Sequence, residues 1–166
     1  MNSTGNIIVL NGTSSSGKTS LAQAFQLQSL DVYLVCSLDM FWDMTPQNIP
    51  AGSHKFPNMK LALIKSVKAL AETGHNVIVD IIFCSDKTYH ELKTELNGFN
   101  FKIIKVECPI DELNKRELAR GDRKLGLAKS QLENIHQGTV YDIVINTYEN
   151  TADECLKILI NEIASS

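Results

Sequence analysis

Eight residues near the start of the chain fit the pattern G-x-x-x-x-G-K-[ST]. They follow an apolar run at 7–10 and precede a helical pattern that begins at Lys18, which is the setting that this loop requires. The glycines allow a tight turn whose N–H groups, together with the helix N-terminus, face the oxygens of a bound phosphate. We therefore predict a triphosphate site, in which Lys18 reaches the β- and γ-phosphates and the Thr19 hydroxyl binds Mg²⁺. The predicted nucleotide-binding residues of this loop are Gly12, Thr13, Ser14, Ser15, Ser16, Gly17, Lys18 and Thr19.

Short apolar runs rich in Val and Ile alternate with helical patterns along the whole chain. The runs lie at 7–10, 32–36, 77–82, 101–108 and 143–145. The helical patterns lie at 18–28, 59–72, 86–96, 110–120 and 151–164. This alternation is typical of buried parallel strands joined by crossover helices. For a chain of 166 residues it predicts one α/β domain over 1–166, with a five-stranded parallel sheet and helices on both faces.

The apolar run Val77-Ile78-Val79 ends in Asp80. A carboxylate at the end of a strand beside the phosphate loop is the expected second half of such a site, because it faces the Mg²⁺ of the bound nucleotide. An aspartate that only caps the next segment is the alternative. Considered with the phosphate loop, the pattern predicts a metal site made of Thr19 and Asp80.

All three arginines of the chain fall between residues 116 and 123, whereas its lysines are spread along the sequence. Their spacing places them on one side of a helix if that helix continues through Gly121. Arginine holds phosphate oxygens in a fork and keeps its charge, so we predict that Arg120 and Arg123 contact the transferred phosphoryl group and that Arg116 binds the nucleotide. The polar stretch at about 110–138 is longer than a crossover helix needs, and we expect it to form a lid. A solvent-exposed helix face is the alternative.

Asp39 follows the second apolar run, at the edge where the carboxyl ends of parallel strands meet. Its carboxylate would accept the proton of an attacking hydroxyl, although an Asx turn explains a single aspartate equally well. The segment from Met40 to Pro57 has no clear period and holds three of the four prolines, and long irregular loops are often functional. Phe41 and Trp42 at its start would form an apolar wall for the acceptor, with ordinary core positions as the alternative.

Charge and composition exclude several classes of protein. The net charge of −3 argues against a general nucleic-acid binder, which neutralises phosphates with an excess of basic residues. No apolar stretch approaches the roughly 18 residues that span a bilayer, and the N-terminal segment lacks the basic residues of a secretory signal. The four cysteines form no Cys-x-x-Cys pair. We therefore expect a cytoplasmic protein with a small-molecule partner; the sequence does not give its oligomeric state.

The tetrad Asn114-Lys115-Arg116-Glu117 resembles the guanine-reading pattern Asn-Lys-x-Asp of GTPases. Glutamate replaces the aspartate, and the tetrad lies inside a helical pattern several residues beyond its strand. We interpret this likeness as a coincidence and expect the nucleotide to be ATP.

Several segments taken together carry a more specific resemblance. They are Leu10 to Lys18, Asp39 to Pro46, Ile78-Val79-Asp80, Ala119-Arg120-Gly121-Asp122-Arg123, His136-Gln137-Gly138 and Tyr141-Asp142. In these segments the chain resembles the chloramphenicol phosphotransferase family from about residue 6 to residue 147. Where that family can carry a second aspartate after the one that matches Asp80, this chain has Ile81, and its segment from Met40 to Pro57 differs in composition.

The resemblance implies a P-loop kinase of the nucleoside-kinase-like type, with strand order 2-3-1-4-5. Such an enzyme phosphorylates a hydroxyl of a small molecule, for example an antibiotic such as chloramphenicol, from ATP and Mg²⁺. The aspartate that matches Asp39 is the family's proposed general base, and the arginine-bearing segment is its lid. Two alternatives remain open: a nucleoside or nucleotide kinase on the same scaffold, and a nucleotide-sensing module without catalytic function.

Overall fold

Five strands form one parallel sheet in the order β2-β3-β1-β4-β5, as the resemblance implied. The computed structural model describes residues 4–56, 58–83, 85–121 and 126–164. The strands are β1 (Ile7–Asn11), β2 (Tyr33–Ser37), β3 (Asn76–Ile81), β4 (Phe101–Glu107) and β5 (Ile143–Asn146). All five coincide with the apolar runs of the sequence to within two residues at either end. The central strand β1 is buried on both faces, whereas the edge strands β2 and β5 are largely half-buried.

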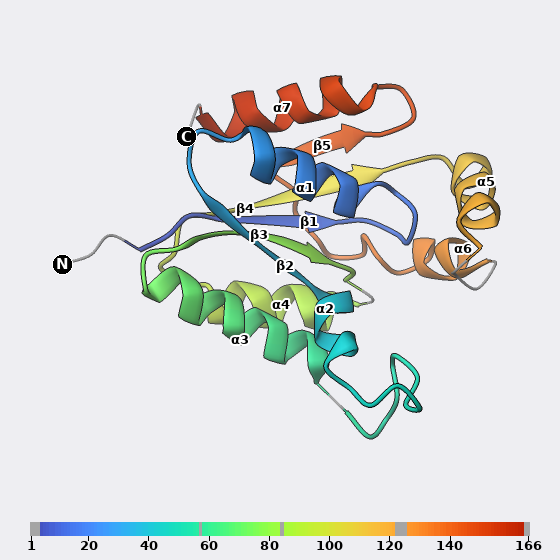
Figure 1. Cartoon of the computed structure of the whole chain (residues 1–166), viewed down its shortest axis with the longest axis horizontal. Helices are drawn as coiled ribbons and strands as arrows, with labels where there is room; N and C mark the ends of the chain where they lie inside the picture. The colour runs from blue at the N-terminus through green and yellow to red at the C-terminus, as the bar shows by residue number, and fades with distance from the viewer. Residues whose placement is uncertain (1–3, 57, 84, 122–125, 165–166) are drawn as a thin grey trace.

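The helices cover both faces of this sheet (Figure 1). They are α1 (Lys18–Gln28), α2 (Leu38–Asp43), α3 (Met59–Glu72), α4 (Asp86–Glu95), α5 (Ile110–Arg120), α6 (Leu127–Leu132) and α7 (Ala152–Ala164). Helices α1 and α7 pack on one face, α3 and α4 on the other, and α5 and α6 lie beyond the carboxyl ends of the strands (Figure 1). No helix in the described ranges is long and apolar enough to span a bilayer.

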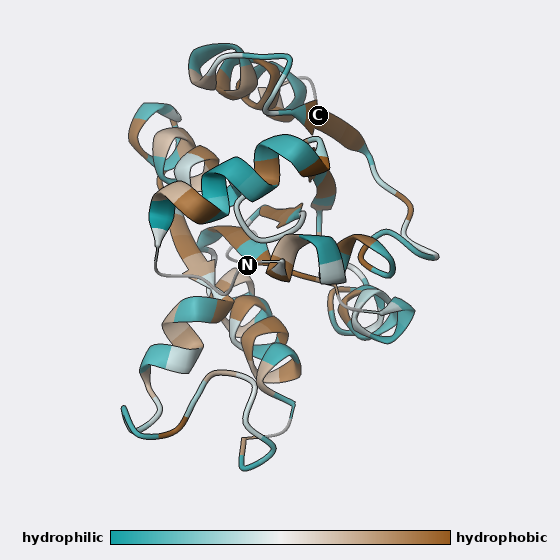
Figure 2. Ribbon diagram, turned by 90° about the vertical axis from the view of Figure 1, so that its right-hand side faces the viewer, coloured by the Kyte–Doolittle hydropathy of each residue, from teal (hydrophilic) through white to brown (hydrophobic). Residues whose placement is uncertain are grey.

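The side chains on the two faces of β1 pack into two separate hydrophobic clusters. Ile7 and Val9 pack with α3 and α4, whereas Ile8 and Leu10 pack with α1 and α7. Figure 2 shows hydrophobic residues gathered on the strands and on the helix faces that meet them. A third, smaller cluster joins α5 to α6 through Leu113 and Ala128. Burial of both strand faces thus fixes the register that brings the carboxyl ends of the strands to one edge.

Two expectations about local structure need correction. The segment from Met40 to Pro57 was expected to be irregular, and residues 44–56 contain no helix or strand. Its first four residues belong to α2, which starts at Leu38, where the Ser37 hydroxyl accepts a hydrogen bond from the Met40 N–H at 3.2 Å and so caps the helix. Helix α5 does not continue through Gly121, because that residue takes the left-handed conformation, with φ of 67°, and ends the helix. The expected three-arginine helix face therefore stops at Arg120, and Arg123 lies outside the described residues.

The division into buried and exposed leucines gives a direct test of this packing. Leu63 on α3 is 0% exposed, and Leu27 near the end of α1 is 84% exposed. Leu63→Ala should lower the free energy of unfolding by about 2–5 kcal/mol, because it leaves a cavity under the sheet. Leu27→Ala should change it by less than about 0.5 kcal/mol. Urea unfolding followed by circular dichroism measures both, and equal losses in the two variants would contradict the assigned core.

Candidate functional site

The loop between β1 and α1 is closely packed against the neighbouring strand. A Cβ atom at Gly12 would lie 2.2 Å from the Val106 carbonyl oxygen of β4, so only glycine fits there. Ser14, Ser16 and Lys18 are nearly inaccessible to solvent, although all three are polar. The buried hydroxyl oxygens of Ser15 and Ser16 find no hydrogen-bond partner within the part of the chain that the structure describes. Unsatisfied buried polar atoms are costly, and an anionic ligand in the loop would supply partners for them.

Lys18, Thr19 and Asp80 meet at the mouth of this loop. The Lys18 Nζ donates to the Thr13 carbonyl oxygen at 2.8 Å and lies 3.6 Å from an Asp80 carboxylate oxygen. The Thr19 hydroxyl donates to the other Asp80 oxygen at 2.6 Å. The structure therefore brings together the residues that the sequence assigned to the phosphate and metal sites.

The oxygen atoms of Thr19 and Asp80 are the hard ligands that Mg²⁺ prefers. Within the described ranges there is no cluster of three or more His, Cys, Asp or Glu side chains that would hold a metal without further ligands. Mg²⁺ commonly binds through one or two protein oxygens and completes its shell with water and substrate phosphates. This pair of residues fits such a site.

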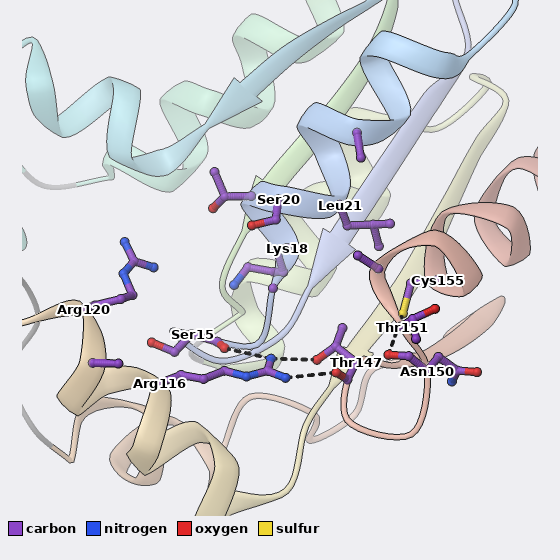
Figure 3. Close-up of a pocket in the computed structure, with 15 residues that line it drawn as sticks. Ser15, Lys18, Ser20, Leu21, Arg116, Arg120, Thr147, Asn150, Thr151 and Cys155 are labelled. Atoms are coloured by element: carbon purple, nitrogen blue, oxygen red, sulfur yellow. Dashed lines mark hydrogen bonds between the residues drawn. The ribbon is translucent and has the colours of Figure 1, made fainter.

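A pocket of about 620 Å³ extends from the phosphate loop between α1, α5 and the start of α7 (Figure 3). Small and apolar side chains line much of it, and polar groups of the loop and of α5 line the rest. Its lining includes Leu21, Ala24, Arg116, Ala119, Arg120, Asn150, Ala152 and Cys155. The pocket thus combines a cationic end beside the phosphate loop with an apolar end that suits a flat ring.

Arg116, assigned from the sequence to the nucleotide, and Arg120, assigned to the transferred phosphoryl group, both line this pocket. The Arg116 guanidinium contacts protein acceptors: its Nε donates to Glu112 at 3.0 Å, and its Nη atoms reach Thr147 at 2.9 and 3.0 Å and the Ser15 carbonyl at 3.5 Å (Figure 3). Arg116 therefore joins α5 to the phosphate loop and to the segment after β5. Arg120 lies one turn further along the same helix, at the pocket.

Thr147 was not identified from the sequence. Its hydroxyl donates to the Ser16 carbonyl oxygen at 2.8 Å and accepts from Arg116, so it supports the loop from the side of β5. A single threonine after a short strand carries no pattern that would have singled it out.

Asn11 was also missed as a site residue, although it precedes the loop directly. Its side chain is fully buried and accepts from the Phe83 N–H at 2.9 Å. The same amide donates to the Ile135 carbonyl at 3.2 Å and to the Tyr141 hydroxyl at 2.6 Å. One side chain therefore ties β1 to the segments after β3 and after α6. The available signal was a polar residue at the end of an apolar run.

The Tyr141 hydroxyl also lies 2.6 Å from the His136 Nδ1. Because Asn11 donates to the tyrosine oxygen, the tyrosine proton is directed to His136, whose Nδ1 then acts as acceptor. Burial lowers the pKa of His136 from its ordinary value, and the charge of Lys105 lowers it further. Burial also raises the pKa of Tyr141. The structure thus favours a neutral histidine.

Asp39 lies in the first turn of α2, and its side chain is exposed. In the sheet register Ser37 pairs with Asp80, so Asp39 follows the end of β2 on the same edge as the metal-site carboxylate. Phe41 packs against the cluster of α3 and α4, and Trp42 is half-buried. Helix α2 therefore presents these residues at the edge where the phosphate loop lies.

A family model of chloramphenicol phosphotransferase-like proteins matches residues 5–164. The chain belongs to this family. It is therefore a phosphotransferase that acts on a hydroxyl group. A Mycobacterium tuberculosis H37Rv protein named as a candidate O-phosphotransferase is 26% identical over 181 residues, which cover 93% of this chain and 80% of that protein.

Solved structures, among them those of kinases, share the fold. The APS kinase CysC of Mycobacterium tuberculosis, in complex with AMPPNP and APS, superimposes with a TM-score of 0.77 at 17% identity, covering 97% of this chain and 98% of that one. A gluconokinase from Sinorhizobium meliloti 1021 gives 0.70 at 16% identity, covering 99% and 94%. The tunicamycin resistance protein of Deinococcus radiodurans gives 0.68 at 12% identity, covering 96% of each chain. These likenesses confirm the predicted P-loop kinase fold.

The neutral state of His136 predicts how stability depends on pH. As pH falls below about 6.5, an unfolded histidine takes up a proton while the folded His136 does not, so the free energy of unfolding decreases. His136→Asn offers the tyrosine a non-titrating acceptor and should make this decrease smaller. Exposed His90→Asn is the matched control and should leave it unchanged. Urea unfolding at pH 7 and 5.5 measures the effect; identical pH dependence in wild type and His136→Asn would contradict the assignment.

Proposed function

We propose that the chain transfers the γ-phosphoryl group of ATP, with Mg²⁺, to a hydroxyl group of a small molecule. The observation that carries this proposal is the contact of Lys18, Thr19 and Asp80 with one another beside the 620 Å³ pocket. Cationic and hydroxyl groups at one end of the pocket suit a triphosphate, and the apolar end suits the base. Mg²⁺ held by Thr19 and Asp80 would neutralise charge on the phosphates as transfer proceeds.

In the proposed reaction the acceptor oxygen attacks the γ-phosphorus while the bond to the β-phosphate oxygen breaks, and ADP leaves. Asp39 takes the proton of the acceptor hydroxyl and holds that hydroxyl in line. Lys18 and Arg120 stabilise the charge on the transferred group, since both line the pocket at its phosphate end. Arg123 is assigned the same role from the sequence alone.

The acceptor is proposed to bind beside α2. Phe41 packs against the core, so we assign it to holding α2 and assign the direct contact with the acceptor to Trp42. Met40 and Met44 are 53% and 68% exposed and lie four residues apart, on one face of this short segment. Methionine adapts to varied apolar shapes, so this surface suits an alcohol with an apolar body, such as an antibiotic.

A nucleotide as acceptor is less well supported. A phosphorylated acceptor requires a second anion site, and the segment from residue 40 to residue 60 offers only Lys55 and Lys60 as permanent cations. A nucleoside without a phosphate remains compatible with the proposed site.

An ADP-release screen with ATP, Mg²⁺ and hydroxylated antibiotics, nucleosides and sugars tests the function. At least one class should release ADP well above the rate with water alone. Lys18→Ala should lower this rate by at least about 10²-fold, because the γ-phosphoryl group loses its cation. Lys87→Ala, at an exposed position on α4, is the matched control and should keep the rate. A chain that binds ATP but transfers to none of these acceptors would instead support a nucleotide-sensing module.

The proposed base is tested by a pair of variants on the same helix. Asp39→Asn should lower kcat by about 10²–10⁴-fold and leave KM for ATP unchanged, because the amide keeps the shape but cannot accept the proton. Asp43 lies four residues after Asp39 and is also exposed, so Asp43→Asn is the matched control and should leave kcat unchanged. Steady-state kinetics with the acceptor found in the screen measures both. If Asp39→Asn weakens ATP binding to the same degree, Asp39 belongs to the nucleotide site.

A further inference from the structure

Glu117 is a charged residue on α5 that is 0% exposed. Its carboxylate oxygens accept hydrogen bonds from the Gly126 N–H at 2.9 Å and the Ala128 N–H at 2.7 Å. The donors are the N-cap residue of α6 and a residue of its first turn, and a buried carboxylate is stable only with such partners. Glu117 therefore fixes the start of α6 relative to α5.

Gln131 lies near the other end of α6 and contacts the phosphate loop. Its side-chain oxygen accepts a hydrogen bond from the Ser14 N–H at 2.7 Å. Ser14 is nearly buried, so this N–H requires a partner. Four residues after the glutamine, in the turn that follows α6, the Ile135 carbonyl accepts from the Asn11 side chain. Helix α6 and the turn after it thus contact Ser14, the third residue of the loop, and Asn11, the residue just before the loop.

Helix α5 contacts the same loop one residue further along. Arg116 reaches the Ser15 carbonyl and Thr147 from the side of β5 (Figure 3). The middle of the loop is therefore held by one side chain from α5 and one from α6, and Glu117 joins these two helices. The contacts form a closed ring that runs from the loop through both helices and back to the loop.

We propose that Gln131 is a positioning residue for the triphosphate and that Glu117 acts through it. Gln131 holds the Ser14 peptide in place, so that the N–H groups of the following residues keep the directions that bind phosphate oxygens. Glu117 holds α6 where Gln131 can reach that peptide. The inference rests on the proposed nucleotide site, but it concerns residues that do not touch the reacting atoms.

This arrangement predicts a larger effect on ATP than on AMP. The loop amides hold the α- and β-phosphates and Lys18 reaches the β- and γ-phosphates, so AMP keeps only the contacts of its single phosphate. A loop whose Ser14 peptide has shifted should therefore weaken the binding of ATP much more than the binding of AMP. A general loss of structure would weaken both ligands.

The test measures ATP and AMP affinity by calorimetry for Gln131→Met, Glu117→Gln and the double variant. Each single change should weaken ATP binding about tenfold, the effect of one lost hydrogen bond, and AMP binding by less than about twofold. Because the two residues act in series, the double variant should also lose about tenfold rather than the roughly hundredfold expected of independent sites. Gln137→Met is the matched control, because the exposed Gln137 side chain donates to the Glu133 carbonyl of its own turn, and it should keep both affinities.

Three outcomes would overturn the inference: unchanged ATP affinity in Gln131→Met, an equal loss for ATP and AMP, or losses that multiply in the double variant. Glu117 is fully buried, so its variant is also checked by thermal unfolding. If Glu117→Gln does not fold, the ATP and AMP affinities of Gln131→Met still test the inference, because Gln131 is only half-buried. A wild-type chain that binds no ATP would contradict the proposed function itself, and so the two failures are distinguishable.

Discussion

The hydrogen bond between the Thr19 hydroxyl and the Asp80 carboxylate joins the first turn of α1 to the strand that lies between β1 and β2. It depends on the parallel register, in which Asp80 pairs with Leu10 on one side and Ser37 on the other. A shift of one residue in either strand pair would turn the carboxylate to the other face of the sheet. The two hydrophobic clusters that lock this register are therefore what keep the phosphate loop, the metal-site carboxylate and Asp39 at one edge.

The sequence predicts the sheet well because each strand is rich in Val, Ile and other apolar residues and each of the longer helices has its own periodicity. These signals are local, and so helices such as α3 begin and end as predicted. The phosphate loop was recognised for the same reason, since its eight residues are consecutive. The missed short helix α2 shows the limit of this approach: six residues give too little periodicity, and the serine cap was the only other signal.

The supporting residues of the site were not predictable in the same way. Thr147 meets Ser16 across 131 positions of sequence, and Gln131 meets Ser14 across 117. Each contacts the backbone of the phosphate loop through a side-chain hydrogen bond, which leaves no pattern in the residues around it. Glu117 seemed an ordinary surface acid in a polar helix, whereas in the fold it is buried and caps α6. Such contacts arise only after the layers have packed.

Asn11 has a consequence for the order in which the chain acquires its structure during synthesis. Its partners lie at Phe83, Ile135 and Tyr141, so the polar groups of this side chain cannot all be paired until residue 141 has left the ribosome. A nascent fragment that ends just before residue 135 contains β1, β3 and the whole phosphate loop. In that fragment the Asn11 NH2 group still lacks both of its acceptors, the Ile135 carbonyl and the Tyr141 hydroxyl. The segment that carries the nucleotide-binding motif is thus translated before the residues that complete its hydrogen bonds.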